Sequence, residues 1–165
     1  MASLPNHFYV TLFSSSSLDI YTKNTIAAFT VKLSQPIDLG DSNENWEVGV
    51  CEISCPPRNV NPGGKPVVFF VDTNILIYCN LISPQFVGDQ TVRVLRTFIT
   101  KSQPCEYRFA EVYYVPVEQR NFQDIRIELL KLDGRRFNFK DSTSPSKVVL
   151  HFRNKNYQRG NIFSL

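Results

Sequence analysis

The chain has 165 residues and a formal charge of +3 at pH 7, and 42% of its residues are hydrophobic. A single domain of this length can bury about 70% of the surface that its unfolded chain exposes, so a sizeable core is available. No run approaches the ~20 apolar residues of a membrane helix, and the N-terminus lacks the basic and then apolar pattern of a secretory signal, so we expect a soluble product of a reducing compartment that is not secreted.

Alternation of apolar and polar residues recurs along the chain, and no window of ten or more residues carries a convincing apolar stripe at helical spacing. Ten strands are predicted, in chain order: His7 to Phe13, Ile26 to Leu33, Asn45 to Ser54, Val67 to Val71, Ile75 to Asn80, Thr91 to Ile99, Glu106 to Val115, Asp124 to Lys131, Arg135 to Lys140 and Lys147 to Phe152. Ten short strands separated by turn residues are typical of an all-β sandwich or barrel.

The strand that begins near Trp46 contains two of the four cysteines, Cys51 and Cys55. Residues four apart on a strand stand roughly 13 Å apart at ~3.3 Å per residue, which is too far for a disulfide or a shared metal ion. The apolar parity also changes near Val50, which predicts a β-bulge that keeps both halves of the strand facing the core. We expect free, mostly buried thiols without a role in chemistry at Cys51, Cys55, Cys79 and Cys105.

The clearest hairpin signal is the Asp133-Gly134 pair, which lies between two alternating runs, Ile125 to Leu129 and Phe137 to Phe139. Asp-Gly is a preferred pair for a tight turn between antiparallel strands, because both positions tolerate positive φ. We therefore expect a hairpin around this pair.

Signals for catalysis or metal binding are missing. The two histidines, His7 and His151, have no Cys or acidic partner at metal-ligand spacing, and the alternation of the last strand places His151 on its polar face with Arg153. No nucleophile elbow occurs, and the glycines of Asn61 to Pro66 lack the spacing of a phosphate loop. The sequence predicts no enzyme, no cofactor and no metal site.

Charge is distributed unevenly, since residues 1–92 hold 4 Lys or Arg against 8 Asp or Glu, and residues 93–165 hold 14 against 7. Solvated charges on strand faces would explain this pattern, but a basic half could also contact an acidic surface of another subunit. The candidate contact residues are Arg135, Arg136, Arg153, Lys155 and Arg159.

Basic residues also flank Phe137 and Phe139, as they do in strands whose aromatic side chains stack on nucleic acid. Any hairpin whose Phe side chains point inward has the same pattern, so specific nucleic-acid binding is disfavoured.

Several stretches together resemble one family. The resemblance lies in four stretches, which are in chain order His7-Phe8-Tyr9-Val10-Thr11-Leu12, Trp46-Glu47-Val48-Gly49-Val50-Cys51-Glu52-Ile53, Ile82 to Asp89, and Val149-Leu150-His151-Phe152-Arg153. Similar stretches follow one another in the same order in the minor capsid (penton) proteins of Polinton/Maverick-type elements and related adintoviruses. This resemblance implies a single jelly-roll β-sandwich of two antiparallel sheets, with about eight to ten strands. It also implies a structural protein that self-assembles as a pentamer at the icosahedral vertices of a virion, with the major capsid protein as its partner.

The expected organisation is one jelly-roll domain over residues 1–153 and a short C-terminal tail over residues 154–165. Two alternatives remain open. One is a β-sandwich that binds a ligand, a carbohydrate or a receptor, and the other is a cellular protein derived from a viral capsid gene. Native mass would discriminate, because a pentamer favours a vertex subunit and a trimer favours a receptor-binding module.

Overall fold

A computed structural model of the chain describes residues 4–41, 45–56, 73–100, 105–139 and 144–158. Within these ranges the chain forms eleven strands and one short helix: β1 (His7–Phe13), β2 (Ala28–Asp38), β3 (Trp46–Cys55), β4 (Thr73–Cys79), β5 (Gln85–Val87), β6 (Gln90–Val92), β7 (Val94–Thr100), β8 (Cys105–Arg108), β9 (Val115–Pro116), β10 (Asn121–Leu130), β11 (Lys147–Asn154) and α1 (Lys155–Gln158).

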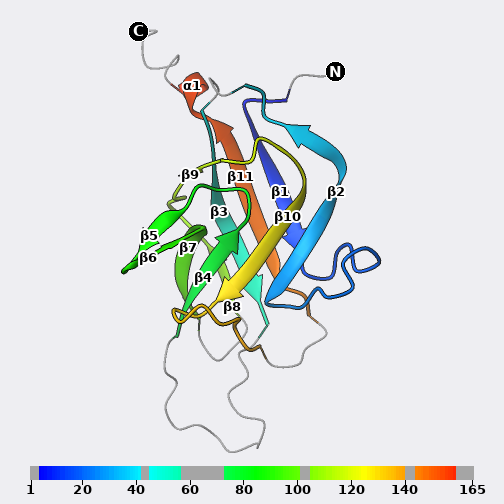
Figure 1. Cartoon of the computed structure of the whole chain (residues 1–165), viewed down its shortest axis with the longest axis vertical. Helices are drawn as coiled ribbons and strands as arrows, with labels where there is room; N and C mark the ends of the chain where they lie inside the picture. Colours follow the sequence, from blue (N-terminus) through cyan, green and yellow to red (C-terminus); the bar gives the residue numbers. More distant parts are fainter. Residues whose placement is uncertain (1–3, 42–44, 57–72, 101–104, 140–143, 159–165) are drawn as a thin grey trace, which may run out of the picture.

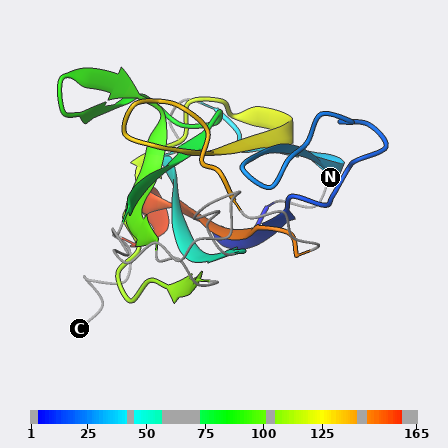
Figure 2. The ribbon, with the colours of Figure 1, turned by 90° about the horizontal axis from the view of Figure 1, so that it is seen from below.

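Nine of the strands form two antiparallel sheets that lie face to face, and β5 and β6 form a separate two-stranded hairpin (Figures 1 and 2). One sheet has the order β1-β11-β3-β8, with β9 also pairing with β3, and the other has the order β2-β10-β4-β7. The chain passes from one sheet to the other between β1, β2, β3 and β4, stays in the second sheet from β4 to β7, and crosses again between β7, β8, β10 and β11. This is the connectivity of a jelly roll. The predicted all-β jelly-roll sandwich is confirmed.

The core fills the space between the two sheets. Leu12, Leu150 and Phe152 enter it from the first sheet and are fully buried. Ile125 and Ile127 enter it from β10 and are equally buried. Alternate residues of each strand face inward, so the apolar alternation in the sequence translates directly into this core.

The predicted bulge in β3 is confirmed. Val149 pairs with Glu52 while the next residue of β11, Leu150, pairs with Val50, so Cys51 is the extra residue. The core residues of β3 on both sides of the bulge are Val48, Val50, Ile53 and Cys55. Cys51 itself is half-buried, and its thiol donates a hydrogen bond to the Val149 carbonyl at 3.3 Å.

The predicted strand from Glu106 to Val115 is wrong in its middle, where the chain leaves the sheet between β8 and β9. The cause is a crossing over β3 at Gly49, where an added Cβ would lie 2.5 Å from the carbonyl oxygen of Tyr113. Glycine permits this close approach of two backbone segments. The alternation in this stretch therefore reflects packing against β3 and not continuous pairing.

The Asp133-Gly134 turn is confirmed, but the second strand of the predicted hairpin is not. Gly134 has φ 79°, and its N–H donates to the Lys131 carbonyl at 2.9 Å. Beyond the turn, one bridge joins Leu130 and Arg136. The chain then leaves the sheet, because Phe137 and Phe139 turn into the core. The predicted end of this strand at Lys140 lies outside the described residues.

Some of the remaining predicted strands and loops differ from the observed ones. The predicted strand Thr91 to Ile99 is divided into β6 and β7, and the stretch Ser83 to Asp89, which the sequence presents as a loop, contains β5. The predicted strand Val67 to Val71 lies outside the described residues. The division of the chain into residues 1–153 and 154–165 stays a prediction; β11 ends at Asn154, and α1 follows it.

Candidate functional site

The basic residues singled out in the sequence lie at two ends of the sandwich. Arg135 and Arg136 belong to the loop after β10, at the lower end in Figure 1, whereas Arg153 is the last but one residue of β11 and Lys155 begins α1, at the upper end. Arg159 lies outside the described residues. The four described residues therefore do not form one continuous patch.

Three of these arginines pair with acidic residues of the same chain. Arg135 pairs with Asp133 at 2.6 Å, Arg136 with Glu128 at 3.3 Å, and Arg153 with Glu47 at 2.6 Å. The hydrogen bond from Arg135 lowers the pKa of the Asp133 carboxyl. Of these three ion pairs, only Arg153–Glu47 joins the basic second half of the sequence to its acidic first half. Lys155, by contrast, is exposed and lines a cavity of about 270 Å³ beside α1 together with Glu47 and Arg120.

A larger cavity, which we call the basic pocket, has a volume of about 360 Å³. Its lining comes from two stretches of the chain that the β2–β10 pairing brings together: Ile20, Tyr21, Thr22, Lys23, Asn24, Ala28, Phe29 and Thr30 from the first, and Arg126 and Arg136 from the second. These lining residues include three cations and no carboxylate, so the pocket suits an acidic or aromatic group.

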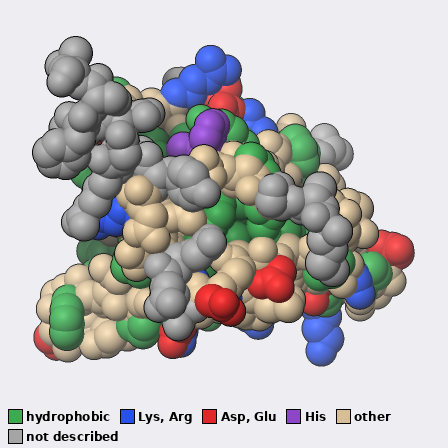
Figure 3. All heavy atoms as spheres, turned by 90° about the horizontal axis from the view of Figure 1, so that it is seen from above, with side chains coloured by type: hydrophobic (Ala, Val, Ile, Leu, Met, Phe, Trp, Pro, Cys, Tyr) green, Lys and Arg blue, Asp and Glu red, His purple; other side chains and the backbone are tan. Residues whose placement is uncertain are grey.

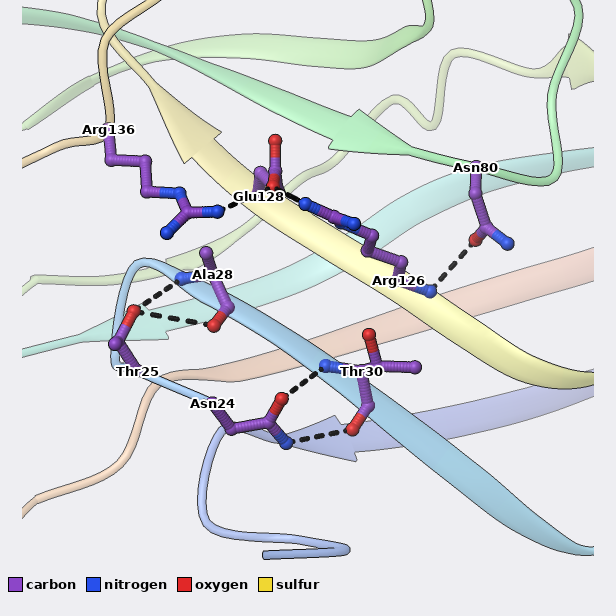
Figure 4. A network of polar contacts seen from close by, with 8 residues as sticks. All are labelled: Asn24, Thr25, Ala28, Thr30, Asn80, Arg126, Glu128 and Arg136. Carbon is purple, nitrogen blue, oxygen red and sulfur yellow. Dashed lines mark hydrogen bonds and ion pairs between the residues drawn. The ribbon is translucent and has the colours of Figure 1, made fainter. Parts of the chain in front are cut away.

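One wall of the basic pocket is held in place by side-chain hydrogen bonds (Figure 4). Asn24 accepts a hydrogen bond from the Thr30 N–H at 2.9 Å and donates one to the Thr30 carbonyl at 2.8 Å. It also donates to the Ser16 carbonyl at 3.2 Å. The Tyr21 hydroxyl donates to Asp124 at 2.6 Å, and this hydrogen bond raises the pKa of Tyr21. The loop before β2 is therefore fixed against β2 and β10.

Behind the other wall, two arginines converge on one carboxylate. Arg126 and Arg136 both contact the same oxygen of Glu128, as Figure 4 shows. The hydrogen bond to Glu128 raises the pKa of Arg126. The side chain of Glu128 is 14% exposed. Because its single negative charge is shared between two positively charged guanidinium groups, the site keeps a net positive charge.

The outer face of the β1–β11–β3 sheet has a second cluster, formed by His7, Tyr9, Tyr114, His151 and Arg153, which we call the histidine cluster. Tyr9 stacks on His151 with ring centroids 4.4 Å apart, and His151 Nε2 lies 3.4 Å from His7 Nδ1. The Tyr114 hydroxyl and His151 Nδ1 are hydrogen-bonded at 2.7 Å, and the Arg153 guanidinium lies 3.4 Å from the Tyr114 ring centroid. Figure 3 shows histidine side chains (purple) at the surface, close to basic and acidic ones.

Burial lowers the pKa of His151, and the neighbouring His7 and Arg153 lower it further. The outward orientation of His151 was predicted correctly, since Leu150 and Phe152 are fully buried and His151 is half-buried. The meeting of the two histidines was not predicted. They are far apart in the sequence, and only the pairing of β1 with β11 brings them together.

Among the residues that the structure describes, no group of three or more His, Cys, Asp or Glu side chains could hold a metal ion. Burial raises the pKa of the Cys79 thiol to about 12, so this cysteine stays protonated at neutral pH. A search of the described helices for one long and apolar enough to span a bilayer finds none.

Neither protein-family models nor curated proteins give a significant match to the chain. Among solved structures, the chain is similar to the crystal structure of the mavirus penton protein, with a TM-score of 0.61 and 10% sequence identity. The match covers 90% of this chain and 99% of that chain. At this level of identity the similarity shows a shared fold, in which both jelly rolls correspond over nearly their full length.

Proposed function

We propose that this chain is a structural subunit of an icosahedral capsid, located at the vertices, and that it acts by assembly and not by catalysis. The observation that supports this proposal is the fold match to the mavirus penton protein, which extends over almost the whole of both chains. A β-sandwich alone would be compatible with many functions. The four sequence stretches that resemble the penton proteins of Polinton/Maverick-type elements and adintoviruses add independent support.

The proposed assembly is a ring of five copies, with the major capsid protein as the outer partner in a virion. Closed fivefold symmetry requires a heterologous contact, in which one surface of a subunit meets a different surface of the next. The sandwich suits such a contact, because β2 and β7 lie at opposite edges of one sheet and differ in sequence.

Native mass spectrometry of the purified chain over a range of concentrations tests this function. We expect a species of five times the 19.0 kDa chain mass, with ring-shaped particles in negative-stain images. A chain that stays monomeric at every concentration, with and without the major capsid protein, would contradict the proposal. A trimer would instead support a receptor-binding module.

A further inference from the structure

We propose that the tip of the β5–β6 hairpin of one copy docks into the basic pocket of a neighbouring copy. Phe86 is the apolar anchor of this contact, and Asp89 is the partner of the pocket cations. The inference rests on the proposed function only in that it requires copies of this chain to associate side by side.

The hairpin presents an aromatic side chain to solvent. Phe86 is 89% exposed, the most exposed of the large hydrophobic residues among those described. A Phe side chain can bury on the order of 150–250 Å² in a contact, so this exposure leaves a large apolar surface uncovered. Phe86 is paired with Thr91 across the hairpin, next to a turn in which Gly88 has φ 60°.

The hairpin is held on the body of the sandwich by its other face. Val87 and Val92 pack on a small buried cluster formed by Leu76, Val94 and Leu130. Because neighbouring residues of a strand point to opposite faces, anchoring Val87 forces Phe86 outward. The exposure of Phe86 therefore follows from the packing of the hairpin.

The hairpin and the pocket lie on different sides of the molecule. In Figures 1 and 2 the β5–β6 hairpin projects from one flank, and the loop between β1 and β2, which forms one wall of the basic pocket, projects from the opposite flank. The two features cannot meet within one chain. When they meet between copies, the contact is heterologous, as a closed ring requires.

The chemistry of the two surfaces is complementary. The pocket has room for an aromatic ring in its volume of about 360 Å³, and it offers the exposed side chain of Ile20 as an apolar contact. Its guanidinium groups favour the face of an aromatic ring. Asp89 is exposed in the hairpin turn, and its carboxylate is suited to pair with Lys23 or Arg136 of the pocket lining. The lining itself contains no carboxylate, and Glu128, which Arg136 contacts at 3.3 Å, lies outside it. Figure 3 shows hydrophobic and acidic side chains together at the end of this projection, at lower left.

Substitutions on both surfaces test the docking through the association constant of the oligomer. Phe86→Ser and Arg136→Glu should each weaken association roughly 30-fold or more, as expected of an interface anchor. Arg135→Glu is the matched control, because it makes the same charge change one residue away, outside the pocket lining. It should leave association unchanged. Asp89→Lys should also weaken association, and the combination with Lys23→Asp should restore part of it.

A crosslinking experiment identifies the contact directly. With benzoylphenylalanine in place of Phe86, irradiation should join the hairpin of one copy to residues 20–30 or 126–136 of another, as read by mass spectrometry of the peptides. Crosslinks to any other region would overturn the proposal. So would a wild-type pentamer whose stability is unchanged by Phe86→Ser, while the proposed function would stand.

A wild-type chain that never associates would overturn both the proposed function and the docking. If Arg136→Glu abolished the binding of inorganic phosphate but left association unchanged, the pocket would be assigned to a free anion, and the docking would again be overturned. Circular dichroism of each variant establishes that it is folded; Phe86 makes little contact with the core, so its loss should not affect folding.

Discussion

At the scale of single residues, Gly49 marks the place where the segment between β8 and β9 crosses β3. A Cβ there would lie 2.5 Å from both the Tyr113 carbonyl oxygen and a methyl group of Val112. The methyl group can rotate away, but the carbonyl belongs to the backbone. We expect Gly49→Ala to lower the free energy of unfolding by about 1–3 kcal/mol, as other overpacking substitutions do.

Urea denaturation measures this change, and Gly88→Ala provides a comparison. Gly88 has φ 60° and no atom within 4 Å of an added Cβ, so its substitution introduces backbone strain without crowding. A Gly49→Ala variant with an unchanged unfolding midpoint would mean that the crossing segment can move aside.

His151 is expected to make stability depend on pH. Its pKa in the folded chain is lowered by burial, His7 and Arg153, so the unfolded chain binds a proton more readily than the folded one. The free energy of unfolding therefore rises with pH in this range. The contribution of neutral His151 to stability is fully present above the unfolded pKa of about 6.5, and it is lost as the pH falls from there through the lower folded pKa. The groups that face the imidazole are His7, Tyr9, Tyr114 and Arg153.

Urea denaturation of the wild type and of His151→Phe between about pH 5 and pH 7.5 measures this dependence. Phenylalanine keeps a ring beside Tyr9 but does not titrate, so the variant should show a flatter profile. This window lies above the titration of Glu52 and Asp133, whose folded pKa values are lowered by their bonds to Lys147 and Arg135. Parallel profiles for the two proteins would show that His151 is not the responsible group.

At the scale of elements, the loop between β1 and β2 depends on one side chain. Asn24 makes three hydrogen bonds, two with the backbone of Thr30 and one with that of Ser16. Asn24→Ala should cost about 1–2 kcal/mol of stability through the backbone groups that it leaves unpaired. It should also increase hydrogen exchange of the Thr30 amide, measured by NMR, and weaken association because the pocket wall is no longer preorganised.

Gln119→Ala is a suitable control, because its amide makes a single long hydrogen bond of 3.4 Å at the surface. If Asn24→Ala left the Thr30 amide as protected as in the wild type, the loop would be held by its other contacts, such as the bond between Tyr21 and Asp124.

The strands differed in how far local sequence could predict them. β1 was predicted with its observed bounds, and the parity change near Val50 located the bulge of β3, because burial on one face imposes a period of two. The β5–β6 hairpin was missed because its Pro, Gly and Asp residues are typical of loops. The crossing at Gly49 was missed because its cause is a contact with a segment more than sixty residues away.

The candidate site was largely beyond prediction from sequence for a similar reason. Arg136 was singled out by its charge, but its neighbours Lys23 and Arg126 were not connected with it. Their proximity depends on the pairing of β2 with β10, and the histidine cluster depends likewise on the pairing of β1 with β11. Periodicity shows which face of a strand is buried, but it does not show which strands are neighbours.

At the scale of the whole molecule, association should weaken as salt increases. The proposed contact joins a carboxylate of one copy to cations of another, and surface charges are screened over about 8 Å at physiological ionic strength. Mass photometry from about 0.05 M to about 0.5 M salt should show a falling association constant. The dependence should be shallower for Asp89→Asn, whereas an identical salt dependence in this variant would exclude Asp89 from the contact.

The hydrogen bonds of the β1–β2 loop have one more consequence, which concerns unwanted association. β2 is the last strand of its sheet, and such a strand exposes unpaired N–H and C=O groups that can recruit a strand of another chain. Here Asn24 covers both groups of Thr30, and Ser17 accepts the N–H of Lys32 at 3.0 Å. Side chains thus occupy the positions of a neighbouring strand, and they protect this edge of the sheet from edge-to-edge aggregation while leaving its side-chain surfaces free to bind a partner.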